Sequence, residues 1–418
     1  MKYPHKFIGL LTLVLSFTTQ ASSLESWMKK QEAASWQKLL ANLSPAGART
    51  GAVIASPQRH NPDYFFHWVR DAALVMDVVM AEQRHRPNAV LAQHIDHYID
   101  FSLFIQEQHT LTNLGEPKYH ADGLAFNGPW GRPQNDSPAL RALYLVRHTQ
   151  FLLKNGTSRS RLGHLYTAEI PAHSLIKRDL EYVAHHWDEA GFDLWEEVKG
   201  DHFYTLLVTR EALREGADLA NTFQDKGAAA FYSWQASLVE SRLKDFVHNN
   251  HFVTMLDQVE GLNYKHSNLD TSILLGVLHA GDNAWVRITD SRLNRTMTLL
   301  EEAFNRVYPL NQRGLAATAL GRYPEDQYYG GNPWILTTLA MAEYHYKLAQ
   351  ALNQKRHIEL GDAYVERVRF HARQDGAMAE QWDRHTGYHI SADELTWSHA
   401  AFITAMRERR EAKLQLSR

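Results

Sequence analysis

A helical pattern that recurs six times along the chain, at intervals of 62 to 67 residues, constrains the fold more than any other sequence feature. In each copy, a loop rich in aromatic and charged residues precedes a stretch of small and apolar residues that is typical of a buried helix. The predicted buried helices begin near Asp71, Pro138, Tyr204, Thr271, Pro333 and Thr396. Convincing strands are scarce, so the pattern predicts an all-α chain.

Each interval also leaves room for a second, amphipathic helix. In the predicted helix over 91–108, Leu91, Ile95, Tyr98 and Ile99 form one apolar stripe with polar residues opposite, as expected of an outer layer. Six such pairs predict an (α/α)6 barrel, with an inner ring of buried helices inside an outer ring. A plain helical array with accidental spacing is the alternative. In the barrel, the six loops before the inner helices would meet at one end of the ring.

Three of the inner helices carry capping signals at their predicted starts. A side-chain oxygen at the N-cap satisfies a free backbone N–H, and proline is favoured at the first helical position. The predicted pairs of cap and first helical residue are Ser137 and Pro138, Asp270 and Thr271, and Asn332 and Pro333.

The first 21 residues are typical of an export leader. Lys2 and Lys6 precede an apolar run over 7–17, and small residues follow around Ala21, where we expect cleavage. This run is too short to span a bilayer, and no later apolar stretch approaches about 20 residues. We therefore expect a secreted or periplasmic protein without membrane contact, in which residues 22–418 form a single domain.

Composition and motif content exclude several kinds of site. The chain has no cysteine, which rules out disulfides, zinc–thiolate centres and thiol nucleophiles. Its net charge of −3, without a long basic block, argues against nucleic acid and favours a neutral ligand. Neither a G-x-S-x-G elbow nor a phosphate-binding loop is present. His94 and His97 are interpreted as a solvated helix face rather than as metal ligands. We expect a monomer that needs no metal or organic cofactor.

The predicted converging loops are rich in aromatic and charged side chains. The first supplies Tyr64, Trp68, Arg70 and Asp71 within eight positions. Aromatic rings can stack on sugar faces, while charged groups hold hydroxyls through strong hydrogen bonds, so the loop suits a neutral polyol. A buried ion pair between Arg70 and Asp71, with Trp68 in the core, is the structural alternative.

The second and fifth loops have the same character. Trp130 lies among glycines and prolines, which favours a fixed, partly exposed indole, although buried filler is an equal alternative. The fifth loop places Arg322, Tyr323, Tyr328 and Trp334 in a Gly-rich turn. Polar, aromatic loops at the end of a barrel are more often functional than structural.

Carboxylates from opposite parts of the ring supply candidate chemistry. Glu196 and Glu197 follow Trp195 in the third loop, and Glu380 precedes the sixth inner helix. Hydrolysis of an acetal needs one protonated carboxyl to assist the leaving oxygen and one carboxylate to activate water or to attack. A glutamate flanked by tryptophan and by a like charge would have a raised pKa, as an acid requires. Each glutamate taken alone is more readily explained as a solvated or ion-paired residue.

At these residues the sequence resembles the glucoamylases, a family of exo-acting α-glucan glucohydrolases with an (α/α)6 barrel. The resemblance covers about residues 24–411, and its blocks stand in the family's order. They read NPDYFFHWVRD, GEPKYHADG, WGRPQNDSPALRA, DLWEEVKGDHF, RYPEDQYYGGNPW and AEQWDRHTG.

The resemblance implies roles for individual residues. By this likeness Glu196 is the general acid and Glu380 the general base of an inverting reaction that releases β-D-glucose from non-reducing ends of α-1,4-glucans, more slowly at α-1,6 links. The positions that match sugar-contacting residues are Tyr64, Trp68, Arg70, Asp71, Trp130, Trp195, Glu197 and Arg322. The implied partner is an α-glucan or a maltooligosaccharide.

Two departures from the family pattern narrow this expectation. Many fungal relatives add disulfides, a linker and a starch-binding module, which this sequence does not show, so we expect weak action on granular starch. Lys199 stands where the fungal pattern has a small polar residue, which leaves preference at later sugar positions open. Trehalose, dextran or isomaltooligosaccharides are alternative substrates. A non-catalytic sugar-binding barrel is disfavoured because both acids are present.

Overall fold

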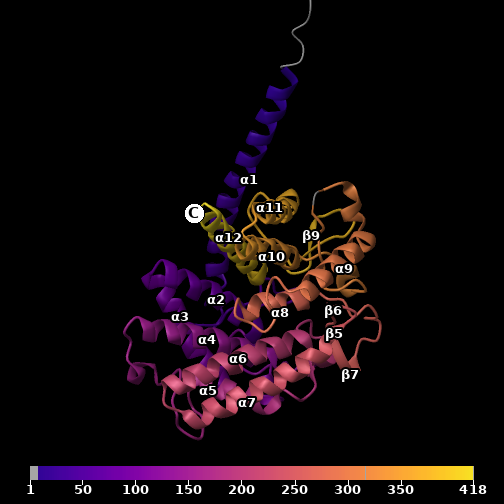
Figure 1. Ribbon diagram of the computed structural model, residues 1–418. Helices are drawn as coiled ribbons and strands as arrows, with labels where there is room; N and C mark the ends of the chain where they lie inside the picture. Colours follow the sequence, from indigo (N-terminus) through magenta and orange to yellow (C-terminus); the bar gives the residue numbers. More distant parts are fainter. Residues whose placement is uncertain (1–7, 316, 418) are drawn as a thin grey trace, which may run out of the picture.

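The computed structural model describes residues 8–315 and 317–417, and these form a double ring of helices (Figure 1). The even-numbered helices contact one another in a closed series from α2 through α4, α6, α8, α10 and α12 back to α2. Their bounds are α2 Val69–His85, α4 Asp136–Lys154, α6 Phe203–Thr222, α8 Ser272–Ala280, α10 Ile335–Leu352 and α12 Thr396–Leu416. The predicted (α/α)6 barrel is confirmed, since all six starts lie within two residues of the predicted positions.

The odd-numbered helices form the outer layer around this ring. Their bounds are α1 Ile8–Ala41, α3 Ala89–Gln106, α5 Leu175–His186, α7 Lys226–Leu243, α9 Ser291–Val307 and α11 Lys355–Phe370. The predicted stripe of α3 is confirmed, because all four of its residues are buried. Of the predicted leader, residues 1–7 lie outside the described residues, and the rest forms the start of α1.

Short strands connect the helices at the loop end of the ring. They are β1 Phe66–Trp68, β2 Lys118–His120, β3 Gly191–Phe192, β4 Val198–His202, β5 Val247–His248, β6 His251–Phe252, β7 Met255–Gly261, β8 Gln381–Trp382 and β9 His389–Ile390. All their pairings are antiparallel: β1 with β2, β3 with β4, β4 with β7, β5 with β6 and β8 with β9. These pairs fix loops that hold the cavity described below.

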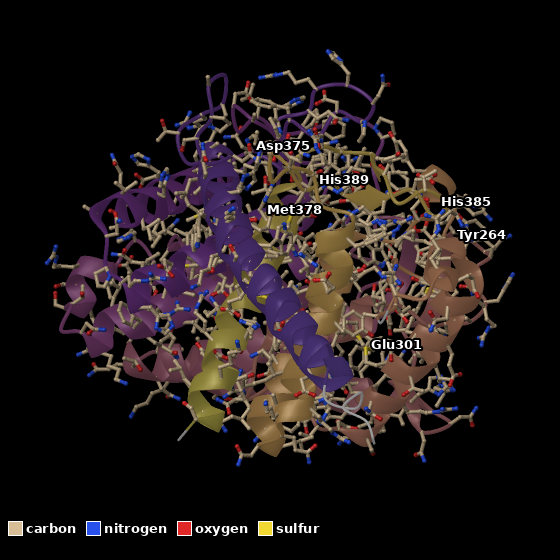
Figure 2. The ribbon with its side chains drawn as sticks, turned by 90° about the horizontal axis from the view of Figure 1, so that it is seen from above. Tyr264, Glu301, Asp375, Met378, His385 and His389 are labelled. Atoms are coloured by element: carbon tan, nitrogen blue, oxygen red, sulfur yellow. The ribbon has the colours of Figure 1, made fainter. Side chains whose placement is uncertain are left out.

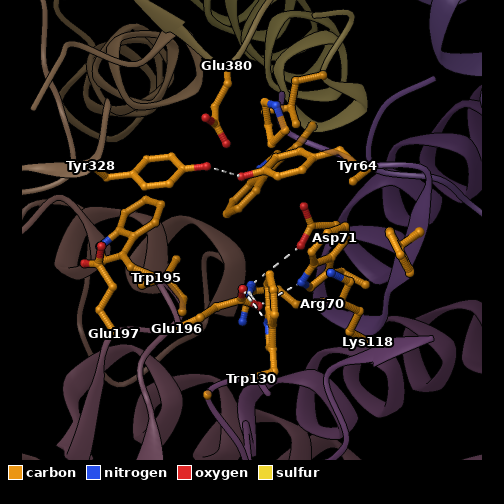
Figure 3. Close-up of a pocket in the computed structure, with 18 of the residues that line it drawn as sticks. Tyr64, Arg70, Asp71, Lys118, Trp130, Trp195, Glu196, Glu197, Tyr328 and Glu380 are labelled. Carbon is orange, nitrogen blue, oxygen red and sulfur yellow. Dashed lines mark hydrogen bonds and ion pairs between the residues drawn. The ribbon is translucent and has the colours of Figure 1, made fainter. Parts of the chain in front are cut away.

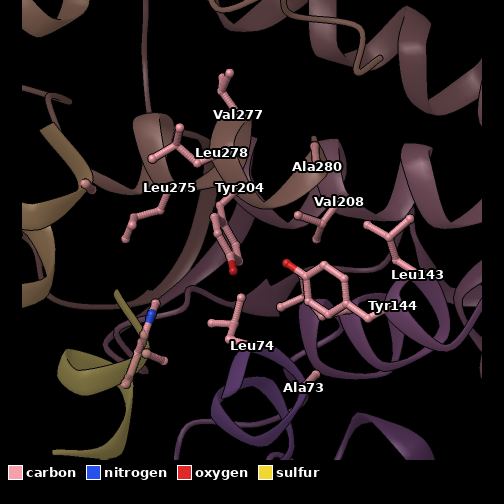
Figure 4. Close-up of a cluster of buried hydrophobic side chains, with 14 of the residues drawn as sticks. Ala73, Leu74, Leu143, Tyr144, Tyr204, Val208, Leu275, Val277, Leu278 and Ala280 are labelled. Atoms are coloured by element: carbon pink, nitrogen blue, oxygen red, sulfur yellow. The ribbon is translucent and has the colours of Figure 1, made fainter. Parts of the chain in front are cut away.

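The main hydrophobic core fills the inside of the ring, where side chains from facing inner helices meet (Figure 4). Leu74 of α2, Tyr144 of α4, Tyr204 of α6 and Leu275 of α8 are all buried. The two tyrosine hydroxyls are satisfied by His279: that of Tyr204 bonds to its Nδ1 at 2.9 Å, and that of Tyr144 donates to its carbonyl at 3.3 Å. Side chains of the inner helices therefore meet inside the ring, and the cavity described below is lined mainly by the loops that precede these helices.

Two of the three predicted caps are wrong. Helix α4 begins at Asp136 after Asn135, without a side-chain cap from Ser137, and α10 begins at Ile335, beyond Pro333. The side-chain amide of Asn332 instead donates to Gln381 at 3.1 Å. Asn332 therefore makes a long-range hydrogen bond in place of the predicted cap. The third signal holds in part, because Asp270 accepts from the N–H of Ser272 at 2.7 Å.

Candidate active site

A cavity of about 620 Å³ lies where the loops before the inner helices meet (Figure 3). All ten residues singled out from the sequence line it: Tyr64, Trp68, Arg70, Asp71, Trp130, Trp195, Glu196, Glu197, Arg322 and Glu380. Among the described lining residues, five of the six loops are represented. The loop before α8 contributes none of these lining residues.

A tight turn between β3 and β4 presents Glu196 to the cavity. The carboxylate of Asp193 accepts from the N–H groups of Glu197 and Val198 at 2.8 and 3.0 Å, and the N–H of Glu196 donates to the Asp193 carbonyl at 2.9 Å. Glu196 adopts φ 69°, in the left-handed region that non-glycine residues rarely enter. Strained backbone of this kind persists where the surroundings hold it, and it is common at functional sites.

The carboxylate of Glu196 accepts hydrogen bonds from loops of other repeats. The indole N–H of Trp68 donates to Oε1 at 2.8 Å and that of Trp130 to Oε2 at 2.7 Å, while Gln134 donates to Oε1 at 3.2 Å. Arg70 approaches Oε1 to 3.4 Å. Burial raises the pKa of Glu196, and Arg70 and these donors oppose the rise. The raised pKa agrees with the sequence prediction, but its largest cause is burial rather than the neighbouring charge.

Glu380 lies on the opposite side of the cavity, directly before β8 (Figure 3). Its Oε2 accepts from the hydroxyl of Ser391 at 2.5 Å and from the amide of Gln381 at 2.8 Å. Burial raises the pKa of Glu380, which the Ser391 and Gln381 hydrogen bonds oppose. Close by, the hydroxyls of Tyr64 and Tyr328 are 2.9 Å apart.

A buried charge cluster lines the cavity beside Glu196. Arg70 is 3% exposed and donates to Asp136 at 2.9 Å and to Gln134 at 2.8 Å. Its Nε lies 3.7 Å from the carboxylate of Asp71. Burial raises the pKa of Asp71 to about 7, with Arg70 acting in the opposite direction. The predicted ion pair therefore exists, and it lines the cavity instead of being sealed in the core.

A second cluster is built around Arg322. Its guanidinium donates to Asp326 at 2.6 and 2.8 Å and to Glu197 at 2.8 Å. Tyr323 donates to the other oxygen of Glu197 at 2.6 Å. Burial raises the pKa of Glu197, and Arg322 opposes the rise. Glu197 is thus held by a cation and a phenol, a different environment from that of Glu196.

Trp195 lines the cavity, whereas its indole N–H bonds to Asp270 of the loop before α8. The indole N–H donates to both oxygens of Asp270, at 3.0 and 3.1 Å. Asp270 is fully buried and pairs with Lys265 at 2.5 Å. The loop before α8 therefore supports the cavity from behind, and the ring of Trp195 packs edge to face on Trp334, with centroids 5.4 Å apart.

Sequence reasoning missed Lys118 as a lining residue. In the antiparallel pair of β1 and β2, Lys118 lies opposite Trp68. The Nζ of Lys118 lies 3.7 Å from the ring centroid of Trp130 and 4.0 Å from that of Phe66. Burial lowers the pKa of Lys118 to about 8. Lys118 belongs to GEPKYHADG, one of the blocks that carry the family resemblance. A single lysine in an extended segment does not by itself predict a contact between its ammonium group and aromatic rings.

Two opposed carboxylates, Glu380 buried and Glu196 half-buried, lie in an aromatic cavity at one end of a double helical ring, which is the arrangement expected of a glycoside hydrolase. The model of glycosyl hydrolases family 15 matches residues 33–360 and 353–407, and the chain belongs to this family. Glucoamylase 1 of Rhizopus oryzae is 33% identical, over 93% of this chain and 72% of its own length. A glucoamylase of Saccharomycopsis fibuligera is 32% identical, over 95% and 92%.

Solved structures agree with these matches. A glucoamylase structure from Saccharomycopsis fibuligera superimposes with a TM-score of 0.84 at 31% identity, covering 93% of this chain and 96% of the other. One from Hypocrea jecorina gives a TM-score of 0.85 at 29% identity, covering 93% and 73%. Within the described part of the chain, no group of three or more histidine, aspartate or glutamate side chains could hold a metal ion.

Proposed function

We propose that the chain is an exo-acting, inverting glucan 1,4-α-glucosidase, with Glu196 as general acid and Glu380 as general base. The observation that carries the assignment is the placement of two carboxylates, each with its own set of donors, on opposite sides of one aromatic cavity (Figure 3). Membership of glycosyl hydrolases family 15 and the similarity to named glucoamylases support α-glucan as the substrate.

The environment of Glu196 suits a proton donor. Burial raises the pKa of its carboxyl, which keeps it protonated at a higher pH than a solvated glutamate. As the C1–O bond breaks, the proton passes to the leaving glycosidic oxygen. The resulting carboxylate then accepts the bonds from Trp68 and Trp130, whose N–H groups are already in place.

Glu380 suits the complementary role. A water between the carboxylate and the sugar attacks C1 from the face opposite the leaving oxygen, and Glu380 takes its proton. Ser391 and Gln381 both donate to Oε2, which orients the group and leaves Oε1 to face that water. Attack on this face inverts the anomeric carbon, so the sugar is released as β-D-glucose.

The arrangement of charged groups around the cavity supports removal of single terminal sugars. Arg70 and Asp71 offer charged donors and acceptors to the hydroxyls of one terminal glucose, and Arg322 with Glu197 does so from the other side. Five loops close around this space, so a chain enters by its end.

The test is proton NMR of the protein mixed with maltoheptaose, in which the first new signal should be β-glucose. Release of α-glucose would refute inversion and the assigned pair, and internal cleavage would refute exo-action.

Variants test the two roles separately. Glu380→Gln should lower kcat by about 10²- to 10⁴-fold. Glu196→Gln should lose least with α-glucosyl fluoride, a substrate whose leaving group needs no acid. The matched control is Glu366→Gln on α11, which removes only an ion pair with Arg369. Wild-type rates in both cavity variants would overturn the assignment.

We also propose that residues 1–21 are an export leader and that residues 22–418 form one catalytic domain, active as a monomer. The basic start and apolar run support the leader. Among the described residues no helix is long and apolar enough to cross a membrane. N-terminal sequencing of exported protein should begin near residue 22, and sedimentation should give the mass of one chain. An intact Met1 on exported protein would contradict the leader.

A further inference from the structure

Residues 391–395, between β9 and α12, contact the proposed catalytic base and are termed the base turn. Ser391 donates to Oε2 of Glu380 at 2.5 Å, and the N–H of Glu380 donates to the carbonyl of Ala392 at 2.8 Å. At the other end of the turn, the N–H of Leu395 donates to the carbonyl of Met378 at 2.8 Å. The position of the Ser391 hydroxyl therefore depends on the conformation of this turn.

Two residues of the base turn have a backbone conformation that residues other than glycine rarely adopt. The φ angle is 66° at Ser391 and 50° at Glu394, both in the left-handed region. Backbone of this kind costs free energy and persists only where the surroundings hold it. The contacts that hold the base turn are therefore important for the geometry of the catalytic base.

Two helices hold the side chain of Glu394. Lys38 of α1 donates to its Oε1, and Nε2 of His399 on α12 lies 3.0 Å from its Oε2. The backbone carbonyl of Glu394 accepts from the amide of Asn42 at 3.4 Å. Burial raises the pKa of Glu394, but the hydrogen bonds from His399 and Lys38 outweigh burial and bring the pKa below its ordinary value. The carboxylate is thus ionised at neutral pH and paired on both oxygens.

Helix α1 also contacts the chain that precedes the catalytic base. The second ring nitrogen of His399, Nδ1, lies 3.2 Å from the hydroxyl of Ser35 on α1. Gln31, one turn earlier on α1, donates to Ser35 at 3.2 Å and to the carbonyl of Gly376 at 2.9 Å. Figure 2 shows Met378, from the same segment as Gly376, beside α1. One outer helix therefore holds the chain on both sides of the proposed base.

Glu394 has no direct contact with the catalytic cavity. It is absent from the described residues that line the cavity, so any effect on the reaction passes through the base turn. The neighbouring residue has its own contacts: the N–H of Asp393 donates to Gln58 at 2.9 Å, and its carboxylate accepts from Arg373 at 2.8 Å. These contacts should keep the turn folded when the Glu394 side chain is changed.

We propose that Glu394 is a positioning residue for the general base. Clamped between Lys38 and His399, it fixes the base turn so that Ser391 keeps its hydrogen bond to Glu380. Without this clamp, the strained turn loses a constraint and the Ser391 hydroxyl is no longer held at hydrogen-bond distance. The inference rests on the proposed function, because it takes Glu380 as the base.

The test is the acid limb of kcat/KM for maltose in Glu394→Asn. Asparagine tolerates the left-handed region and is too short to bond to both partners of Glu394. Weakening of the Ser391 hydrogen bond raises the pKa of Glu380, so the acid limb should move about 0.5–1 pH unit higher. KM at the optimum should stay near the wild-type value. Lys38→Met should shift the limb in the same direction, and Lys38→Arg, which keeps the charge, should restore it.

A double variant tests whether Glu394 acts through Ser391. If it does, Glu394→Asn combined with Ser391→Ala should shift the acid limb no further than Ser391→Ala alone. The matched control is Glu32→Gln, which removes another ion pair between α1 and α12, with Arg410 at 2.7 Å, and should leave the limb in place. Additive shifts in the double variant would overturn the proposal, and so would an unmoved limb in Lys38→Met and Glu394→Asn. Should Glu394→Asn fail to fold, Lys38→Met alone decides.

Failure of this inference and failure of the proposed function give different results. A wild-type kcat in Glu380→Gln would overturn the base role itself, whatever the Glu394 variants do. An inactive Glu380→Gln together with an unmoved acid limb in the Glu394 and Lys38 variants would overturn only the positioning role.

Discussion

Replacement of Trp130 by phenylalanine should move the alkaline limb of the pH–activity profile. Its indole N–H donates to Glu196 at 2.7 Å and favours the ionised carboxylate. A hydrogen bond to a charged group contributes about 1.5–3 kcal/mol. Because three other groups share the carboxylate, we take the lower end, which corresponds to about one pKa unit.

The sign of the shift follows from the acid role proposed for Glu196. Loss of the donor disfavours the ionised form, so the pKa of Glu196 rises. Activity needs the protonated form and falls as pH rises through that pKa. In Trp130→Phe the alkaline limb of kcat/KM should therefore lie about one pH unit higher than in the wild type, and the acid limb, set by Glu380, should stay in place.

The assay is kcat/KM for maltose between pH 3 and 9, compared with Trp195→Phe as a matched control. Trp195 lines the same cavity, but its N–H donates to Asp270, so its loss should leave the alkaline limb unmoved. An unshifted limb in Trp130→Phe, or equal shifts in both variants, would refute the reasoning.

Three further outcomes are expected from single substitutions. Ser391→Ala removes a 2.5 Å hydrogen bond to Glu380, so the pKa of Glu380 should rise and the acid limb of kcat/KM should move to higher pH. An unmoved acid limb would show that Ser391 does not set the pKa of Glu380. Arg141→Met leaves the fully buried carboxylate of Asp179 without its bidentate partner and should lower the free energy of unfolding by about 3–5 kcal/mol, measured in urea. Gly51→Ala should also destabilise strongly, because φ is +89° and the new Cβ would lie 1.9 Å from a carbonyl of α3; a wild-type melting temperature would contradict this packing.

Much of the architecture could be predicted from the sequence because the repeated pattern extends over whole helices rather than over single residues. Burial of one helix face requires an apolar pattern over several turns, and six such patterns located every inner helix to within two residues. The caps were less predictable. Asn332 has the chemistry of a cap, but its amide bonds to Gln381, 49 positions along the chain, and no local pattern reports that contact.

The site could be predicted where residues stand together in one block, as in the loop from Tyr64 to Asp71. Lys118 was missed because its role depends on the register of β1 and β2, which places it beside Trp68. The support from Asp270 was missed as well, since its carboxylate was interpreted only as a cap, and the bond from Trp195 joins loops of different repeats. In both cases the contact joins segments that are distant in the sequence, so no local sequence pattern predicts it.

The indoles of Trp68 and Trp130 make two kinds of contact: both residues line the cavity, and their N–H groups donate to Glu196. Substrate preference and acidity optimum therefore share the same side chains. Any change of these rings that reshapes the pocket for another glucoside also retunes the proton donor, so the two properties would evolve together.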